Sequence, residues 1–371
     1  MPTPLAPRFA RAAVMRAAGE PLKLEELPVP PLRAGELLVR VACCTVCGSD
    51  LHTWTGRRDA ALPTILGHEA VGVVVDAGAD RPHDGAGAPL SIGDRVVWTI
   101  HGSCGQCDYC RDRGMPMKCR SLRKFGHERC DRPPYLVGGM ADHAVVEAGM
   151  TVYRVPDSLP DEVAAPAACA GATAVAACQA ARLGAADRVL IIGAGALGAY
   201  AAAYAAQVGC SAVLATDRCA GRLGAIRRFG ATAAVTANGP PDAVADSLRE
   251  AVSAATEGEG VDAVIEVAGA PQAAAASLAL LRVGGRLVTC GCVFPGAEAR
   301  VDLSLITKNR LTITGLHNYH AEHLGEALEL LEATIDRRPW RSLVGERFAL
   351  GRVNEALGAA LTRQSLRVAI T

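Results

Sequence analysis

The sequence carries no net charge, because 38 Lys and Arg balance 38 Asp and Glu among its 371 residues. Nucleic acids and acidic membrane surfaces both select proteins with a basic excess, so we expect neither as a partner. The start of the chain also lacks the apolar core of a secretory signal. We therefore expect a cytoplasmic protein whose 14 cysteines are reduced.

Internal repeats and long low-complexity tracts are also absent from the sequence. One stretch, residues 189–216, has no charged residue and, by its number of residues alone, is long enough to cross a bilayer. Glycines interrupt it early, and alanine rather than leucine or isoleucine fills the remainder. The stretch therefore predicts a buried strand, a tight turn and a buried helix, and no transmembrane segment.

A chain of this length exceeds what one hydrophobic core usually serves, so two domains are expected. Short strands such as "ELLVRVAC" and "AVGVVVDAG" fill residues 13–160. The Arg-rich residues 8–26 could suggest a transit peptide, but residues 12–30 predict a strand, a turn and a strand, so we assign this stretch to the fold. From Asp161 onward, apolar strands such as "DRVLIIG" and "GVDAVIEVAG" alternate with Ala-rich helical stretches. The pattern predicts an α/β protein, with a β-rich barrel-like domain followed by a helix-covered parallel sheet.

A nucleotide-binding motif opens this second half. Gly193, Gly195 and Gly198 form G-x-G-x-x-G after an apolar strand and at the start of a helix. The first glycine permits a tight turn, the second lets backbone approach a pyrophosphate, and the third lets helix and strand pack closely. The pyrophosphate is then expected at the helix N-terminus, beside Ala196 and Leu197.

The strand after this helix distinguishes a cofactor site from a plain glycine-rich turn. It ends in Asp217, about 20 residues beyond the last glycine, where an acid binds the adenosine ribose and repels a 2′-phosphate. Arg218 and Arg222 follow closely and are included in the predicted site. The motif therefore predicts NAD rather than NADP.

Four cysteines share the segment "CGQCDYCRDRGMPMKC": Cys104, Cys107, Cys110 and Cys119. Four thiolates at this spacing predict a closed tetrahedral zinc site, with an iron–sulfur cluster or unpaired thiols as the alternatives. A closed site has no open coordination position, so it would stabilise the lobe 101–120 and take no part in catalysis.

A second metal site is predicted around "CCTVCGSDLH" and "GHE". Catalytic zinc needs three protein ligands and one open position. Cys47 and His68 supply two ligands, and Cys169, just before the nucleotide-binding half, is the candidate for the third. Zinc would then lie between the domains, near a nicotinamide, whereas Cys43 and Cys44 are expected to be packing residues.

The polar residues around these ligands acquire roles in the same interpretation. Asp50 can hold the far nitrogen of His68. Ser49 can take a proton from the substrate hydroxyl and pass it through the cofactor ribose to His52. Each residue alone is more often a packing residue, but the combination, which includes Glu69, favours a catalytic site.

Together these motifs resemble the zinc-dependent medium-chain alcohol dehydrogenases. The similarity runs from about Ala12 to the C-terminus through "CGSDLH", "GHE", "GDRVV", the four-cysteine segment, "GAGALG" and "VDAVIEVAG", in the family's order. It implies a GroES-like β-rich catalytic domain over 1–165 and a Rossmann domain, a doubly wound parallel sheet, over 166–313. A C-terminal segment, 314–371, would return to the catalytic domain, and the chain would form a homodimer or homotetramer.

The resemblance also assigns roles to matching positions. Ser49 and His52 fall on the family's proton relay, and Asp217 falls on its ribose-binding acid. Two zinc ions per chain are implied, one catalytic and one structural. The implied catalytic zinc ligands are Cys47, His68 and Cys169. Glu69 is the implied nearby carboxylate that can swing onto the metal.

Two features depart from or vary within the family pattern. Cys119 lies one position farther from Cys110 than is usual, which leaves Cys130 as a weaker candidate for the fourth structural ligand. The third catalytic ligand is often Glu in the polyol branch, so Cys169 fits the alcohol branch.

A narrower resemblance concerns the substrate. The segments "CRSLRKFGHE", "CVFPG" and "GLHNYHAEHL" are similar to a subgroup proposed to act in phosphonate metabolism. A phosphonate dianion would need a cationic pocket. The candidate cations are Arg57, Arg58, Arg123, Lys124, His127 and His317.

We therefore expect a zinc-dependent oxidoreductase that transfers a hydride between NAD(H) and a primary or secondary alcohol, aldehyde or ketone. Hydroxyalkylphosphonate or phosphonoacetaldehyde is the narrower substrate prediction. Within the fold, a polyol, cyclitol or amino-alcohol dehydrogenase and a zinc-free quinone or enoyl reductase are alternatives. A zinc-ribbon nucleic-acid-binding protein is the alternative from another class, against which the neutral charge argues.

Overall fold

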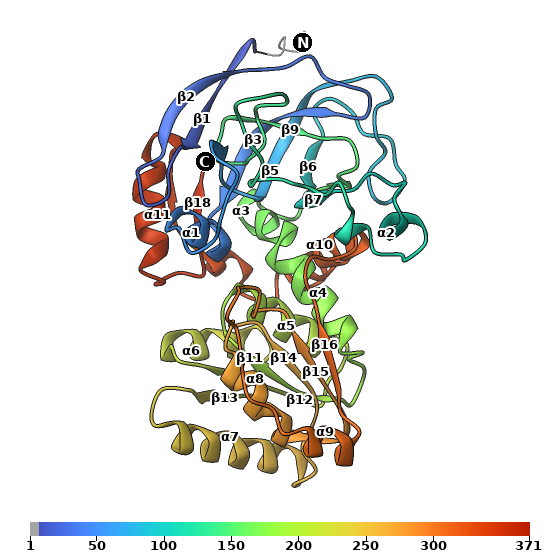
Figure 1. Cartoon of the computed structure of the whole chain (residues 1–371), viewed down its shortest axis with the longest axis vertical. Helices are drawn as coiled ribbons and strands as arrows, with labels where there is room; N and C mark the ends of the chain where they lie inside the picture. Colours follow the sequence, from blue (N-terminus) through green and yellow to red (C-terminus); the bar gives the residue numbers. More distant parts are fainter. Residues whose placement is uncertain (1–6) are drawn as a thin grey trace. The chain divides into compact units, whose positions relative to one another are not determined.

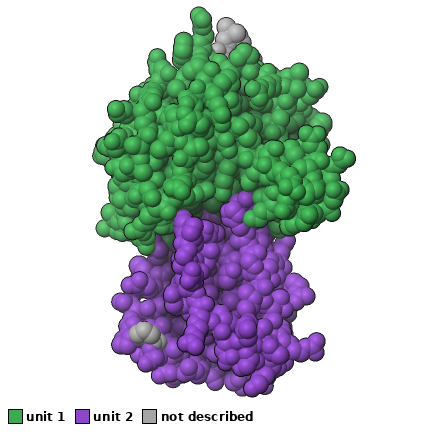
Figure 2. All heavy atoms as spheres, in the orientation of Figure 1, with its two compact units in different colours: residues 1–169, 320–335, 340–371 green, residues 170–319, 336–339 purple. Residues whose placement is uncertain are grey.

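The computed structural model describes residues 7–371 and divides into two compact units (Figures 1 and 2). The first unit contains the described residues up to Cys169 together with His320–Ile335 and Trp340–Thr371. The second contains Ala170–Tyr319 and Asp336–Pro339. Figure 2 draws the first unit in green and the second in purple.

The first unit is β-rich. Its largest sheet has the order β10-β6-β5-β3-β18-β17, with β9 also paired to β3, and its smaller sheets are β2-β1-β4 and β7-β8. The strands are β1 (Phe9–Met15), β2 (Lys23–Pro28), β3 (Leu37–Thr45), β4 (Thr64–Ile65), β5 (Glu69–Ala77), β6 (Arg95–Trp98), β7 (His101–Gly102), β8 (Arg123–Lys124), β9 (His143–Val146), β10 (Val152–Arg154), β17 (Val344–Phe348) and β18 (Arg367–Ile370). The helices are α1 (Gly48–Trp54), α2 (Asp108–Arg111), α3 (Asp161–Ala164), α10 (Glu322–Thr334) and α11 (Val353–Leu361).

The pairing of three strands in this sheet determines where its polar side chains meet. β3 and β5 are antiparallel with Thr45 opposite Glu69, so the end of β3 lies beside the start of β5. β18 pairs with the same end of β3, with Ala369 opposite Thr45. Apolar residues such as Leu37 and Val71 are fully buried. Segments from the beginning and the end of the chain are therefore held together by one sheet.

The second unit is a six-stranded parallel sheet with helices. Its strand order, β13-β12-β11-β14-β15-β16, is the doubly wound arrangement. The strands are β11 (Arg188–Ile192), β12 (Ala212–Asp217), β13 (Ala233–Thr236), β14 (Val261–Glu266), β15 (Leu281–Thr289) and β16 (Thr312–Gly315). The helices are α4 (Ala170–Ala180), α5 (Ala196–Gln207), α6 (Ala220–Arg228), α7 (Pro241–Thr256), α8 (Pro271–Ser277) and α9 (Leu303–Asn309).

The uncharged stretch 189–216 forms β11, α5 and β12, as its composition predicts. Val189, Leu190 and Ile191 are fully buried, because a central parallel strand is covered on both faces. Within residues 7–371, no single helix is long and apolar enough to cross a membrane. One bent pair of helices, Asp161–Ala168 and Ala170–Ala180, has the necessary length and composition only when the two are taken together. The two architectures confirm the predicted α/β class.

Candidate metal centre and dinucleotide-binding site

Four side chains predicted at the catalytic metal site meet in the first unit. One potential ligand atom from each of Cys47, His68, Glu69 and Cys169 lies within 4.8 Å of the other three. The β3–β5 pairing brings them together, because Cys47 follows the end of β3 and His68 precedes β5. Two thiolates and an imidazole are donors that zinc prefers, so the residues present fit the predicted ion.

Asp50 orients this group. Its fully buried carboxylate lies 3.1 Å from Nδ1 of His68 and accepts backbone N–H bonds from Cys47 at 2.9 Å and Gly67 at 3.0 Å. Nε2 of His68 is thereby left as the nitrogen available to a metal. Burial disfavours the charged ring, but Asp50 and Cys47 outweigh it and raise the pKa of His68 to about 10. Metal binding at Nε2 therefore has to displace a proton.

The two predicted relay residues lie on helix α1. Ser49 Oγ is 3.1 Å from Nε2 of His68, which puts the hydroxyl next to the position a metal would take. His52 is half-buried farther along the same helix, and it lies outside the four-residue cluster. Burial, followed by the charge of Arg57, lowers the pKa of His52 below its ordinary value.

The two cysteines of the cluster differ in acidity. A hydrogen bond from Cys169 lowers the pKa of Cys47 well below its ordinary value, against the effect of burial and with help from Arg367. The same contact, together with burial, raises the pKa of Cys169. One sulfur is therefore poised as a thiolate, the form in which cysteine ligates zinc.

Arg367 is a member of this site that the sequence interpretation missed. Its Nε and Nη2 atoms each donate to Glu69 at 2.7 Å, and Nη2 lies 3.5 Å from Cys47 Sγ. Thr45 Oγ1 also donates to Glu69 at 2.7 Å, so the carboxylate is fully engaged in this conformation. The only signal in the sequence is one Arg in the otherwise apolar closing strand "LRVAIT". The swing of Glu69 onto the metal stays a prediction.

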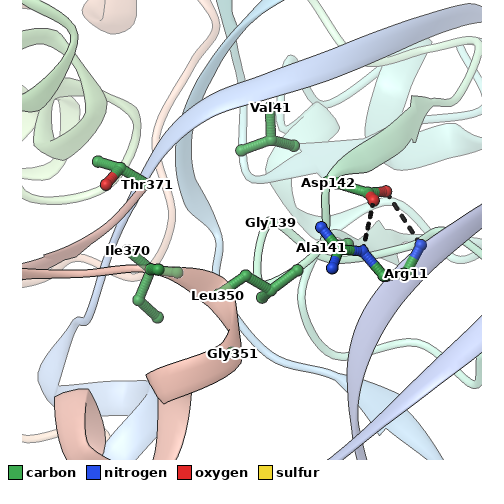
Figure 3. Close-up of a pocket in the computed structure, with 10 residues that line it drawn as sticks. Arg11, Val41, Gly139, Ala141, Asp142, Leu350, Gly351, Ile370 and Thr371 are labelled. Atoms are coloured by element: carbon green, nitrogen blue, oxygen red, sulfur yellow. Dashed lines mark hydrogen bonds and ion pairs between the residues drawn. The ribbon is translucent and has the colours of Figure 1, made fainter.

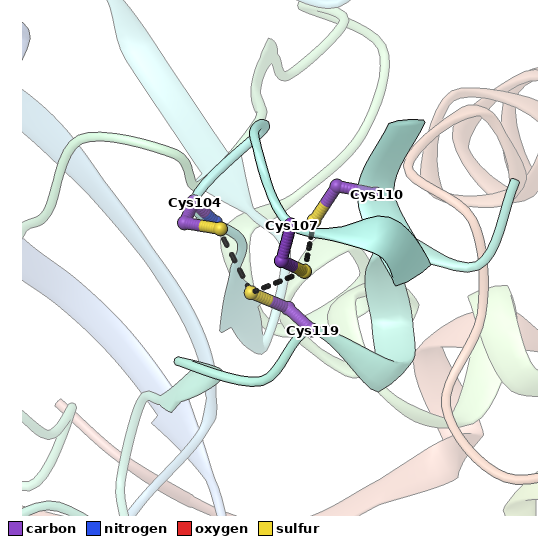
Figure 4. Close-up of side chains that lie close together, drawn as sticks. All are labelled: Cys104, Cys107, Cys110 and Cys119. Atoms are coloured by element: carbon purple, nitrogen blue, oxygen red, sulfur yellow. Dashed lines mark hydrogen bonds between the residues drawn. The ribbon is translucent and has the colours of Figure 1, made fainter. Parts of the chain in front are cut away.

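The four cysteines of the predicted structural site also converge, as Figure 4 shows. One sulfur each from Cys104, Cys107, Cys110 and Cys119 lies within 4.8 Å of the others. Cys107 Sγ is 3.5 Å from Cys110 Sγ and 3.9 Å from Cys119 Sγ. Four sulfurs at these separations suit a tetrahedral zinc ion. Cys130 is buried and belongs to neither metal-type cluster found in residues 7–371.

The glycine motif in the second unit has the geometry of a dinucleotide site. It follows β11 and leads into α5, with Gly195 at the position that precedes the helix and Ala196 and Leu197 in its first turn. A Cβ on Gly198 would lie 2.0 Å from the carbonyl oxygen of Gly193, so helix and turn pack as closely as the motif requires.

Asp217 lies beside this motif. It ends β12, and its carboxylate accepts backbone N–H bonds from Ala194 at 2.7 Å and from Cys219 at 2.8 Å. Arg218 is exposed directly after it, and Arg222 is half-buried on α6. The glycines, a free helix N-terminus and an acid at the second strand fit a nicotinamide dinucleotide.

A cavity of about 430 Å³ in the first unit contains none of the predicted site residues (Figure 3). Apolar side chains such as Val41, Leu350 and Ile370 line it, and Arg11 donates to Asp142 at its rim. This cavity is therefore not the predicted metal or nucleotide site.

Comparisons with known proteins agree with both halves of this description. The alcohol dehydrogenase GroES-like domain matches residues 33–157, and the zinc-binding dehydrogenase family matches residues 196–333. An L-threonine 3-dehydrogenase from Deinococcus radiodurans is 30% identical over 366 residues, which cover 96% of this chain and 97% of that protein.

Solved structures give the same result. An alcohol dehydrogenase from Thermotoga maritima has a TM-score of 0.91 at 27% identity and covers 98% of this chain and 99% of its own. An alcohol dehydrogenase from Thermus sp. has a TM-score of 0.83 at 28% identity, with 97% and 99% covered. These matches exclude the zinc-ribbon nucleic-acid-binding alternative. The chain belongs to the zinc-dependent medium-chain alcohol dehydrogenase family, and it is an oxidoreductase that uses zinc and a nicotinamide dinucleotide.

Proposed function

We propose that this enzyme oxidises a small alcohol at a zinc ion held by Cys47, His68 and Cys169, with NAD as the hydride acceptor. The observation that carries the proposal is the convergence of these three donors around a histidine whose far nitrogen is held by Asp50. Three protein ligands leave one coordination position for a substrate oxygen. Zinc bound there supplies Lewis-acid polarisation of that oxygen, and the nicotinamide supplies the hydride acceptor.

The chain's own residues handle the proton. Ser49 Oγ lies 3.1 Å from the His68 nitrogen that faces the metal position, and its hydroxyl can accept the substrate's proton. Below its lowered pKa His52 is already charged, so it accepts a relayed proton only above that pKa. Asp50 does not exchange protons in this scheme, because its oxygens hold His68 and two backbone groups. Ser49 and His52 thus relay the proton, and Asp50 orients His68.

The carboxylate of Asp217 supports NAD over NADP within this proposal. It is fixed by two backbone N–H groups next to the glycine motif, and a 2′-phosphate there would meet its negative charge. Arg218 and Arg222 follow in the chain and reduce that repulsion. We therefore expect a preference for NAD that a charge-neutral substitution at Asp217 would weaken.

The substrate we propose carries an anionic group, with hydroxyalkylphosphonate as the specific candidate. A second "GHE" motif, Gly126 to Glu128, places the His127 ring 5.3 Å from the His68 ring. Arg58 Nη1 is 3.4 Å from Nε2 of His127. Lys124 is two residues before Gly126, and burial, with Arg58 adding to it, lowers the pKa of Lys124 to about 8.

Cationic groups gathered close to the metal centre can give charge-assisted hydrogen bonds to an anionic group of the substrate. The other predicted cations fit less well. Arg123 pairs with Glu147 at 3.2 Å and Glu128 at 3.6 Å, Arg57 is exposed, and His317 belongs to the second unit. Lys124 and Arg58 are therefore the cations we assign to the anionic group. Burial, followed by the charge of His68, lowers the pKa of His127 well below its ordinary value, so we assign His127 to the same group as a neutral hydrogen-bond donor.

The test compares kcat/KM for NADH formation with 2-hydroxyethylphosphonate, L-threonine and uncharged primary alcohols and polyols. We expect the phosphonate to be preferred, and Lys124→Met or Arg58→Met to lower its kcat/KM by at least about tenfold, because each removes a charge-assisted hydrogen bond. Arg81→Met, at an exposed arginine outside the predicted site, is the matched control and should leave it unchanged. If the enzyme prefers L-threonine, which carries a carboxylate, the anionic substrate stands but the phosphonate candidate is wrong. If it prefers uncharged alcohols, the proposal of an anionic substrate is wrong.

We also propose that the enzyme is a homo-oligomer. β16 forms one edge of the parallel sheet, and apolar side chains on and near it are exposed: Ile313 by 45%, Val283 by 64% and Leu303 by 71%. An open edge with exposed apolar residues favours pairing with another chain. A second copy of the same edge is the partner we propose.

A further inference from the structure

Glu266, the last residue of β14, holds two loops of the second unit together. Its carboxylate is fully buried and receives five donors. Oε1 accepts the backbone N–H groups of Ala268 at 2.7 Å, Gly269 at 2.6 Å and Ala270 at 3.1 Å. Oε2 accepts the backbone N–H of Gly291 at 3.1 Å and the thiol of Cys292 at 3.4 Å. The first three donors follow β14 and the other two follow β15.

The two loops are in direct contact at glycines. A Cβ on Gly291 would lie 2.3 Å from the backbone nitrogen of Gly269 and 2.8 Å from Glu266 Oε1, so no side chain fits there. The Glu266 carbonyl oxygen also accepts backbone N–H bonds from Cys290 at 3.0 Å and Gly291 at 3.1 Å. One residue therefore fixes both its own loop and the next one.

This pair of loops abuts the glycine motif. A Cβ on Gly193 would lie 3.1 Å from both the nitrogen and the Cβ of Ala268, and Val267 N donates to Ile192 O at 2.9 Å. β14 lies next to β11 in the sheet, on the opposite side from β12 (Figure 1). Dinucleotides bind at the carboxyl ends of the strands at this change of direction in doubly wound sheets.

We infer that Glu266 is a positioning residue for the cofactor: it sets loops 267–270 and 290–292 against the glycine motif as one rigid surface. The inference rests on the proposed binding of NAD at that motif. Glu266 reaches the cofactor only through these loops. A carboxylate is needed because both oxygens must accept, whereas the amide of a Glu266→Gln variant would turn N–H groups toward other N–H groups. A shorter Glu266→Asp side chain keeps the charge but cannot reach both loops.

The test measures NADH binding by fluorescence titration in the zinc-loaded full chain. We expect Glu266→Gln and Glu266→Asp each to raise the Kd for NADH by about tenfold, the effect of leaving a buried donor unpaired. KM for NAD should rise by a similar factor while kcat at saturating NAD changes much less. Asp262→Asn, near the other end of β14 and outside both loops, is the control for loss of a buried carboxylate and should bind NADH as wild type does.

A thermal unfolding series separates positioning from general stabilisation. A positioning role predicts that the stabilisation by saturating NADH is smaller in both Glu266 variants than in wild type, since it depends on Kd. Variants with a lower melting temperature but an unchanged NADH-induced increase would overturn the inference, as would a wild-type Kd. If one variant does not fold, the other decides. Failure of wild type to bind NADH would overturn the proposed function as well.

Discussion

Asp50 supports the metal centre although it is not one of the predicted ligands. It fixes the ring of His68 and the backbones of Cys47 and Gly67 with one carboxylate. Residues that hold a metal's histidine ligand typically contribute 10–100-fold to metal affinity or activity. The sequence predicted this contact because Asp50 and His68 belong to short motifs with known spacing.

Replacing Asp50 with Asn should therefore weaken zinc binding by about 10–100-fold, because Cys47 and His68 lose their common support. Competition with a chelator at fixed pH measures the affinity. The exposed Asp59→Asn is a matched control from the same region. Equal zinc affinities in the two variants would contradict the role assigned to Asp50.

Arg367 marks the limit of prediction from the sequence at this scale. Its partner Glu69 is 298 positions away in the chain. No local pattern links the two, and only the pairing of β18 with β3 brings them together. An Arg in an apolar strand indicates that a buried partner exists but does not identify which residue it is.

A second residue-scale prediction concerns Asp262, which is 5% exposed and bonded to Arg188 and Arg282. Burial raises the pKa of this carboxyl, but the hydrogen bonds from the two arginines outweigh it, and the pKa is lowered overall. A depressed pKa means that the stabilisation is present above the unfolded value, about 4, and is lost as pH falls through the folded pKa.

Asp262→Asn should therefore lower the free energy of unfolding by about 2 kcal/mol at neutral pH, with the difference shrinking as pH falls below about 4. Urea unfolding at several pH values measures it. Asp246→Asn, which breaks an exposed pair with Arg249, should change little. A pH-independent deficit in Asp262→Asn would contradict the electrostatic account.

At the scale of elements, the long apolar strands of both units were predictable because period and composition mark them. The strands β4, β7 and β8 were not, since each has two residues and no period to detect. The β7–β8 pair nevertheless matters, because it flanks the four-cysteine lobe, with Gly102 opposite Arg123. Tertiary pairing, not local propensity, forms these elements.

The lobe gives an element-scale prediction about the fourth structural ligand. Cys119→Ser should lose one zinc ion per chain and lower the melting temperature, because a structural zinc ion contributes folding free energy directly. Cys130→Ala should keep the wild-type zinc content, since Cys130 lies outside the cluster. Metal analysis of the purified proteins distinguishes the two, and zinc loss in Cys130→Ala alone would reverse the assignment.

At the scale of the whole molecule, the α/β class and the β-rich and parallel-sheet architectures were predictable from the change of pattern near Asp161. The short return of Asp336–Pro339 to the second unit was not, because four residues carry no signal of their own. The family resemblance predicts a homodimer or homotetramer but does not say which surface forms the contact. The exposed edge strand β16 is the surface that we propose.

Light scattering should therefore give wild-type enzyme a mass that is a multiple of the monomer's. Ile313→Lys, on the edge strand, should shift the mass toward the monomer because a charge at an apolar contact is costly. Leu361→Lys, at a residue of equal 45% exposure in the first unit, is the matched control. A monomeric wild type would contradict the proposed association.

The central claim is that chemistry occurs at the Cys47–His68–Cys169 centre with NAD. The most direct test measures NADH formation and zinc content together in wild type, Cys47→Ala and Cys43→Ala, the last a buried neighbour outside both clusters. We predict that Cys47→Ala loses one zinc ion and all NADH formation above background, while Cys43→Ala retains both zinc ions and the activity. Undiminished NADH formation in Cys47→Ala would contradict the account.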